Sequence, residues 1–233
     1  MEPWIALAKG PLFRVALSIC VLGLAYRLFV TVAHIARAWR KAGDRDLPLR
    51  SVLRATLGWI FPARLLSARP VYSTASFVFH LGVLLVPLFL AGHVALLEGW
   101  LPGFWPSLVP SVADALSVAA LLMAAGLLLA RLGSANARAL SRAGDIGILV
   151  LILLVFLCGI LAAHPSLSPL GARGMLLAHI LLADLALALT PLSKIAHCVL
   201  FPLTQLVFQL GWHFPAETGH HVALALGKEN EPV

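Results

Sequence analysis

The chain has 233 residues, of which 61% are hydrophobic and 12% are charged, and its formal net charge is +7. A soluble domain is about half apolar and about a quarter charged, so the composition excludes an ordinary soluble protein and indicates one surrounded by lipid. A basic soluble protein would suggest a nucleic-acid partner. Here the basic residues lie in loops between apolar segments, so we expect no nucleic acid and interpret the charge as a sign of membrane topology.

Five segments are long and apolar enough to cross a bilayer, which takes roughly 20 residues of helix. The first lacks a small-residue cleavage site and is too long for the apolar part of a signal peptide, so we treat it as mature structure. We therefore predict an all-α membrane protein with five transmembrane helices. In chain order the segments are Leu12–Ile35, Thr74–Leu97, Val112–Leu132, Asp145–Ala163 and Met175–Phe201.

The distribution of Lys and Arg predicts the orientation of these helices. The loops after the first and third segments are rich in Arg, whereas the second loop has no basic residue and the fourth has only Arg173. Cytoplasmic loops carry the excess of positive charge, so we expect the N-terminus outside and the C-terminus in the cytoplasm.

The chain divides into a transmembrane module, residues 1–204, and a C-terminal cytoplasmic arm, residues 205–233. Within the module, the cytoplasmic loop 36–73 contains Leu47–Leu66, where Arg alternates with Leu, Ile, Trp and Phe. This stretch is interpreted either as an amphipathic helix on the membrane surface or as a docking surface for a cytoplasmic subunit.

Four histidines fall within the predicted helices, where imidazole is costly and usually functional. His179 and His197 are separated by 18 residues, which is five turns of helix and about 27 Å, so they are expected on one face. His80 and His93 lie on a helix that runs in the opposite direction. His80 is therefore expected at the depth of His197 and His93 at the depth of His179, an arrangement suited to two six-coordinate haems inside the bundle.

The expected rotation between the side chains of His80 and His93 opposes this assignment of the four histidines. On a straight helix, 13 residues turn the side chain by roughly 220°, so His80 and His93 share a face only if the helix bends, and Pro87 lies between them. A membrane histidine can also simply bond a neighbouring helix, although four in matched pairs favour ligation. The other histidines lie at a helix end, in a loop or in the tail and are not expected to bind haem: His34, His164, His213, His220 and His221.

Three stretches resemble the cytochrome b gamma subunit of respiratory nitrate reductase and the related membrane cytochromes of heterodisulfide-reductase-type complexes. They are Phe79-His80-Leu81-Gly82 with Gly92-His93, then Arg131-Leu132 and Ser134 with Gly144-Asp145-Ile146, and finally His179 with Pro191-Leu192-Ser193-Lys194 and His197. The last stretch is the most specific, since it combines the histidine spacing with a Pro-x-Ser-basic element.

The resemblance implies five helices with two b haems in the inner membrane of a bacterium. His80 and His197 would hold the haem near a cytoplasmic iron–sulfur subunit, and His93 and His179 the haem beside an outer quinol site. The implied function is electron transfer between the quinone pool and that partner. The alternative is a haem-free membrane anchor or a small transporter subunit.

Other residues are candidates for supporting roles. Asp184 and Glu98 are expected to accept quinol protons, although Asp184 is also explained by a bond to a neighbouring helix and Glu98 by hydration. Arg27, Arg131 and Lys194 are expected to bind haem propionates. The positive-inside rule is the alternative explanation for each of them and the favoured one for Arg131.

The loop between the second and third segments contains Trp100, Phe104 and Trp105. It is interpreted either as part of an interfacial aromatic belt or as the cap of a quinone pocket.

Overall fold

The computed structural model describes residues 1–41, 50, 53–54, 57–58, 63–98, 102–210, 218–228 and 230, and every regular element in them is a helix. Five helices of this described part are long and apolar enough to cross a membrane: Glu2–Arg40, Pro70–Phe89, Pro110–Gly133, Ala143–Ala163 and Gly171–Leu189. The protein is therefore a multi-pass membrane protein, and the predicted all-α class and number of spans are confirmed.

The first span is longer than the sequence predicted. It begins with α1 (Glu2–Leu7), passes through the π-helical turn η1 (Ala8–Leu12), and continues as α2 (Phe13–Lys41). Pro3 is tolerated in the first helical turn, where its missing N–H would have no helical acceptor. Pro11 lies inside the π-helical turn, an irregularity that lets the helix continue past a residue without an N–H.

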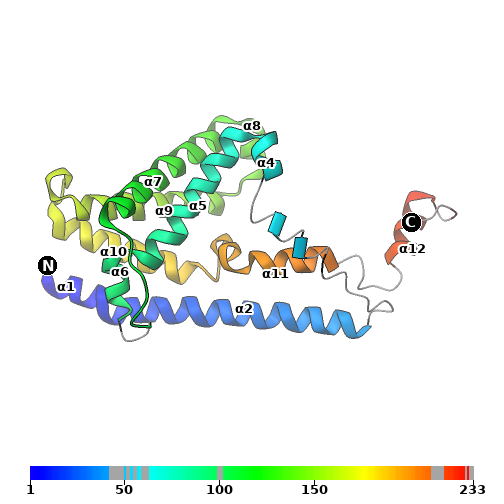
Figure 1. Ribbon diagram of the computed structural model, residues 1–233, viewed down its shortest axis with the longest axis horizontal. Coiled ribbons are helices and arrows are strands. Elements are labelled where there is room, and N and C mark those ends of the chain that lie inside the picture. Colours follow the sequence, from blue (N-terminus) through cyan, green and yellow to red (C-terminus); the bar gives the residue numbers. More distant parts are fainter. Residues whose placement is uncertain are drawn as a thin grey trace. The chain divides into compact units, whose positions relative to one another are not determined.

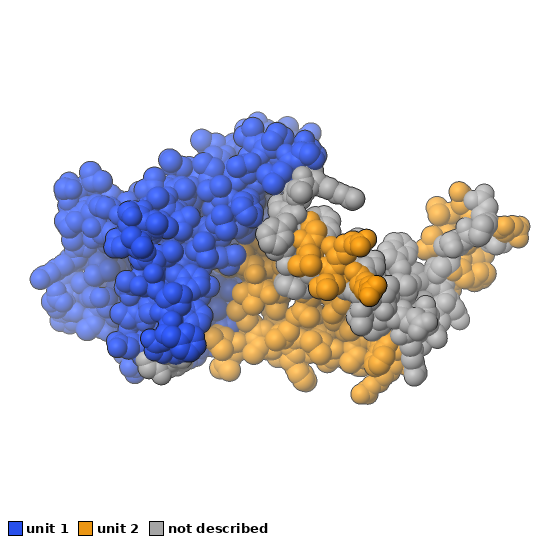
Figure 2. Space-filling view, viewed as in Figure 1, with its two compact units in different colours: residues 1–20, 64–193 blue, residues 21–63, 194–233 orange. Residues whose placement is uncertain are grey.

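The chain forms two compact units, which Figure 2 distinguishes by colour. Unit 1 comprises residues Met1–Cys20 and Arg64–Ser193, and unit 2 comprises Val21–Ala63 and Lys194–Val233. The division falls within α2, whose first residues belong to unit 1.

Unit 1 is a helical bundle. In it, α5 (Pro70–Phe89) packs on α7 (Pro110–Gly133), α7 on α9 (Ala143–Ala163), and α9 on α10 (Gly171–Leu189) (Figure 1). The start of the first span packs against α10, where Ile5 and Ala8 form a buried cluster with Ile180. Between α5, α7 and α9 the core is formed by Val86, Ala120 and Phe156.

The second predicted helix, Thr74–Leu97, is wrong as one continuous element. α5 ends at Phe89, Leu90 has extended backbone angles (φ −67°, ψ 129°), and the short α6 (Ala91–Leu96) follows. Pro87 removes one helical N–H and its ring crowds the preceding turn, and the helix ends two residues later, at Phe89. The bend that the histidine pairing requires is therefore a complete break.

The fifth predicted helix, Met175–Phe201, is also wrong as one element. α10 ends at Leu189, residues 190–193 form a turn, and the 3₁₀-helical η3 (Lys194–Ala196) leads into α11 (His197–Leu210). Pro191 cannot donate the N–H that would continue α10. His179 and His197 are consequently on different helices, and the five-turn argument for a shared face does not apply.

The described parts of unit 2 are the remainder of α2, residues of the following loop, η3, α11 and α12 (Thr218–Leu226). The predicted boundary between module and arm, 204/205, falls within α11. Of the stretch Leu47–Leu66, most residues lie outside the described part, as does Trp100. Two short helices complete unit 1 and its border: α4 (Ala63–Ala68) and α8 (Ala135–Leu140).

Close packing of α5 on α7 depends on Gly82. A Cβ atom there would lie 2.5 Å from the Ala120 Cβ and 3.1 Å from the Leu116 carbonyl oxygen. We expect Gly82→Ala to force the helices apart and to destabilise the protein by about 1–3 kcal/mol, the usual cost of overpacking. Thermal unfolding in detergent measures this effect. The matched control is Gly126→Ala on α7, where a Cβ meets nothing within 4 Å, and equal stability of the two variants would contradict the packing described.

Candidate functional site

Two histidines face one another in unit 1, His93 on α6 and His179 on α10. Their ring centroids are 5.9 Å apart and their planes differ by only 4°. Both side chains are partly buried. The structure therefore brings together the pair that was matched by depth, even though the helix geometry behind that prediction was wrong.

Backbone carbonyls orient both rings. Nδ1 of His179 lies 2.9 Å from the carbonyl oxygen of Val155 on α9, and Nδ1 of His93 lies 3.3 Å from that of Val86 on α5. A proton on each Nδ1 would make these hydrogen bonds and leave Nε2 with its lone pair. This is the usual tautomer of a metal-ligating histidine, whose other ring nitrogen donates to a carbonyl or carboxylate.

Gly159 makes room for His179. A Cβ atom at Gly159 would lie 2.9 Å from the His179 Nδ1 and 3.0 Å from its Cε1. The ring therefore rests directly against the backbone of α9, one turn after the Val155 carbonyl that it bonds. Two residues of α9 thus set both the position and the rotation of this imidazole.

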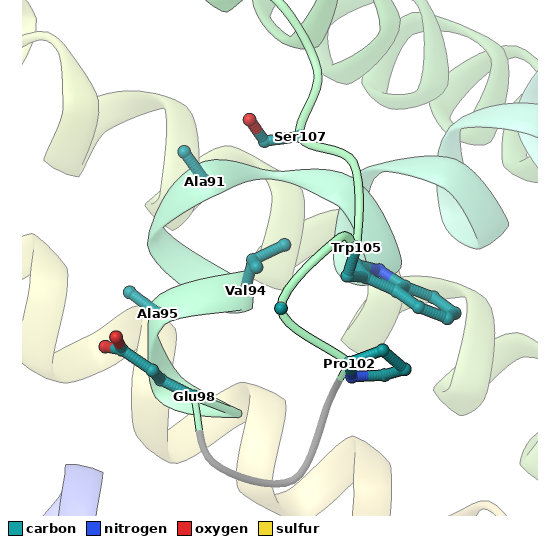
Figure 3. A pocket seen from close by; sticks show the side chains of 8 residues that line it. Ala91, Val94, Ala95, Glu98, Pro102, Trp105 and Ser107 are labelled. Carbon is teal, nitrogen blue, oxygen red and sulfur yellow. The ribbon is translucent and has the colours of Figure 1, made fainter.

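A pocket of about 370 Å³ lies beside the helix that carries His93. Figure 3 shows α6 on one side of it and the following loop, with Pro102, Trp105 and Ser107, on the other. Among the described residues that line it, Glu98 carries the charge and Ala91, Val94 and Ala95 are apolar. It is a partly open hollow lined by apolar side chains and few polar groups.

His80 and His197 belong to different units. His80 is partly buried on α5, with Nδ1 2.7 Å from the Ser76 carbonyl oxygen and its ring edge-on to Phe79. His197 begins α11, with Nδ1 at the Lys194 carbonyl and Nε2 3.8 Å from the Cys198 Sγ. Each ring is oriented by a local backbone carbonyl, and their pairing stays a prediction.

The two predicted proton acceptors are in different settings. Glu98 is exposed and lines the pocket. Asp184 is 4% exposed on α10, and its Oδ2 has no hydrogen-bond partner among the described residues. A carboxyl group in this position fits the protonated form, since an unpaired buried charge is strongly unfavourable.

The predicted propionate ligands are spread over both units. Arg131 lies in the last turn of α7 in unit 1, whereas Arg27 on α2 and Lys194 in η3 are exposed in unit 2. Their propionate roles stay predictions.

Among the described residues, the histidines that were not expected to bind haem belong to elements other than α6 and α10. His164 follows α9 and lies 3.6 Å from the Asp114 carboxylate, and both side chains are substantially exposed. His220 and His221 are neighbours on α12, and His34 is on α2. His213 is outside the described residues.

No family model matches the chain, and no solved structure matches it. A protein of Nitratidesulfovibrio vulgaris is 35% identical over 221 residues, which cover 92% of this chain and 95% of that protein. The chain belongs to this protein's family. The relative is described only as a protein, so the comparison supports a shared fold over nearly the whole length and adds no activity.

Sequence reasoning missed the groups that hold the histidines in place. Gly159 and the Val155 carbonyl lie on α9, a helix in which no functional residue was predicted. A glycine on an apolar helix was the available signal, because it permits close approach of another helix. The carbonyls that bond the rings leave no sequence signal, since every residue has one.

The contact with Gly159 is testable without knowledge of the ligand. We expect Gly159→Ala to push the His179 ring off the Val155 carbonyl and to lower stability by about 1–3 kcal/mol. The control is Gly147→Ala on the same helix, where a Cβ meets nothing within 4 Å. Thermal unfolding compares the two variants, and modification of His179 by an imidazole-specific reagent should be faster in Gly159→Ala alone. Equal behaviour would show that Gly159 does not position the ring.

Proposed function

We propose that the protein is a membrane cytochrome b subunit that transfers electrons between the quinone pool and a partner iron–sulfur protein through two b haems. The observation that carries the proposal is the parallel pair of rings, His93 and His179. Both have Nδ1 at a backbone carbonyl, and α6, the helix that carries His93, borders the pocket.

The two rings are parallel, with centroids 5.9 Å apart. Through their Nε2 atoms, His93 and His179 would together hold one haem. Two neutral histidines on facing helices are the ligand set expected of a haem within a helical bundle.

A bound haem would supply one-electron chemistry that no side chain of this protein supplies. The chain's own contribution is to fix the tautomer and rotation of each ligand. His80 and His197 are proposed to hold the second haem, because Nδ1 of each also lies at a backbone carbonyl. Arg27, Arg131 and Lys194 are proposed to pair with propionates.

The pocket beside α6 is proposed to bind the quinone. Oxidation of a quinol to a quinone releases two electrons and two protons, so the site needs a proton acceptor. Glu98 lines the pocket and is exposed, which gives a proton a route to water. Asp184 is enclosed, which fits a structural role better than proton release.

The direction of the helices follows from the charge of their loops. We propose that the N-terminus and the pocket face the outside of a bacterial inner membrane, and that the Arg-rich loops face the cytoplasm. The iron–sulfur partner would then dock on the cytoplasmic side, near His80 and His197. Electrons would cross the membrane between the two histidine pairs.

Spectra of the purified protein test the proposal. A reduced-minus-oxidised spectrum should show b-type bands with about two haems per chain. His93→Ala and His179→Ala should each lower the content to about one, because one axial ligand is lost. His164→Ala is the control and should keep both haems. Protein that retains its bound ligands but lacks b-type bands would overturn the proposal in favour of a haem-free anchor or transporter subunit.

Quinol oxidation tests the role of Glu98. Removal of a proton acceptor typically slows turnover by about a hundredfold or more, so we expect Glu98→Gln to lower kcat for a soluble quinol by roughly that factor while both haems stay bound. Asp114→Asn, which neutralises another exposed carboxylate, serves as the control. If Glu98→Gln turns over at the rate of Asp114→Asn, Glu98 does not accept the proton.

A further inference from the structure

The break after α5 removes the usual donors of backbone carbonyls in the last turn of that helix, among them those of Leu88 and Phe89. In a continuous helix, the carbonyls of Leu88 and Phe89 would accept hydrogen bonds from the N–H groups of residues 92 and 93. At Leu90 the backbone turns extended, and the His93 N–H donates to the Leu90 carbonyl instead, at 2.8 Å. The two carbonyls therefore need donors from elsewhere.

The loop after α6 supplies both donors. The indole N–H of Trp105 donates to the Leu88 carbonyl at 3.0 Å, and the Leu108 N–H donates to the Phe89 carbonyl at 2.7 Å. The Trp105 ring also stacks on Phe89, with centroids 5.6 Å apart and planes 9° apart. One aromatic side chain thus bonds and covers the last turn of α5.

His93 depends on the same turn. The Val86 carbonyl accepts the last helical bond of α5, from the Leu90 N–H at 3.0 Å, and it also lies 3.3 Å from Nδ1 of His93. The Leu90 carbonyl in turn accepts from the N–H groups of His93 and Val94. The shape of the break therefore determines where α6 begins and how the His93 ring is rotated.

We propose that Trp105 is a positioning residue for His93. Its indole N–H and its stacking on Phe89 stabilise the extended conformation at Leu90. That conformation positions α6 so that the His93 ring is parallel to that of His179. Trp105 is also one of the residues that line the pocket. The haem measurement that tests this inference rests on the proposed function. The role of Trp105 in fixing the position of α6 does not depend on that function.

Hydrogen exchange tests the hold on α6. Trp105→Phe keeps an aromatic ring for Phe89 but removes the indole donor. In protein reconstituted in lipid nanodiscs, we expect the amides of residues 91–96 to exchange roughly threefold to tenfold faster, which corresponds to the loss of one hydrogen bond. Trp4→Phe, at a tryptophan 64% exposed on α1, is the matched control. Phe89→Leu is a second variant, which removes the stacking but keeps the donor and should show a smaller increase.

The haem signal tests the consequence for His93. In the holoprotein, the low-spin electron paramagnetic resonance signal of the haem that His93→Ala abolishes should shift in Trp105→Phe, while the other haem signal and the Trp4→Phe spectrum stay as in the wild type. Unchanged exchange of residues 91–96 would overturn the hold on α6, and an unshifted signal would overturn the positioning of His93. Wild-type protein without haem would overturn the proposed function, and the exchange rates would still decide whether Trp105 holds α6.

Discussion

A backbone carbonyl at or within a bilayer needs a hydrogen-bond donor from the protein, because lipid offers none. An intact helix meets this requirement by itself, whereas a helix broken at Leu90 does not. An unmet carbonyl costs about 1–3 kcal/mol, so the two donors from Trp105 and Leu108 stabilise the break. The conformation of the loop, the start of α6 and the rotation of His93 all follow from this one requirement.

A backbone carbonyl also orients His179, in this case one that belongs to an intact helix, α9. Its carbonyl at Val155 is already part of a helical ladder and accepts the ring as an additional bond, which a carbonyl with two lone pairs permits. The approach is possible because Gly159 has no Cβ. The two histidines are therefore oriented differently. His179 is oriented by an intact helix that contains a glycine, and His93 by a broken helix whose end is bonded by Trp105.

The number and class of the spans could be predicted from sequence because hydropathy over about 20 residues has few structural interpretations. The continuity of those spans was predicted less well. Pro87 and Pro191 were visible, but a proline can kink a helix or end it, and packing decides which occurs. At Pro87 the decision depends on Trp105, a residue 18 positions later whose indole bond to Leu88 no local pattern reveals.

The structure places His93 beside His179, the two histidines that were expected at the same depth, while their ligation of a haem stays a prediction. Leu90 interrupts the segment between His80 and His93 with one residue of extended backbone. Rotation about the helix axis is lost at such a break, so the predicted angle between His80 and His93 had no bearing on the outcome. The break therefore makes the orientation of the His93 side chain independent of that of His80. Because of the break, the backbone between His80 and His93 does not fix the angle between their side chains.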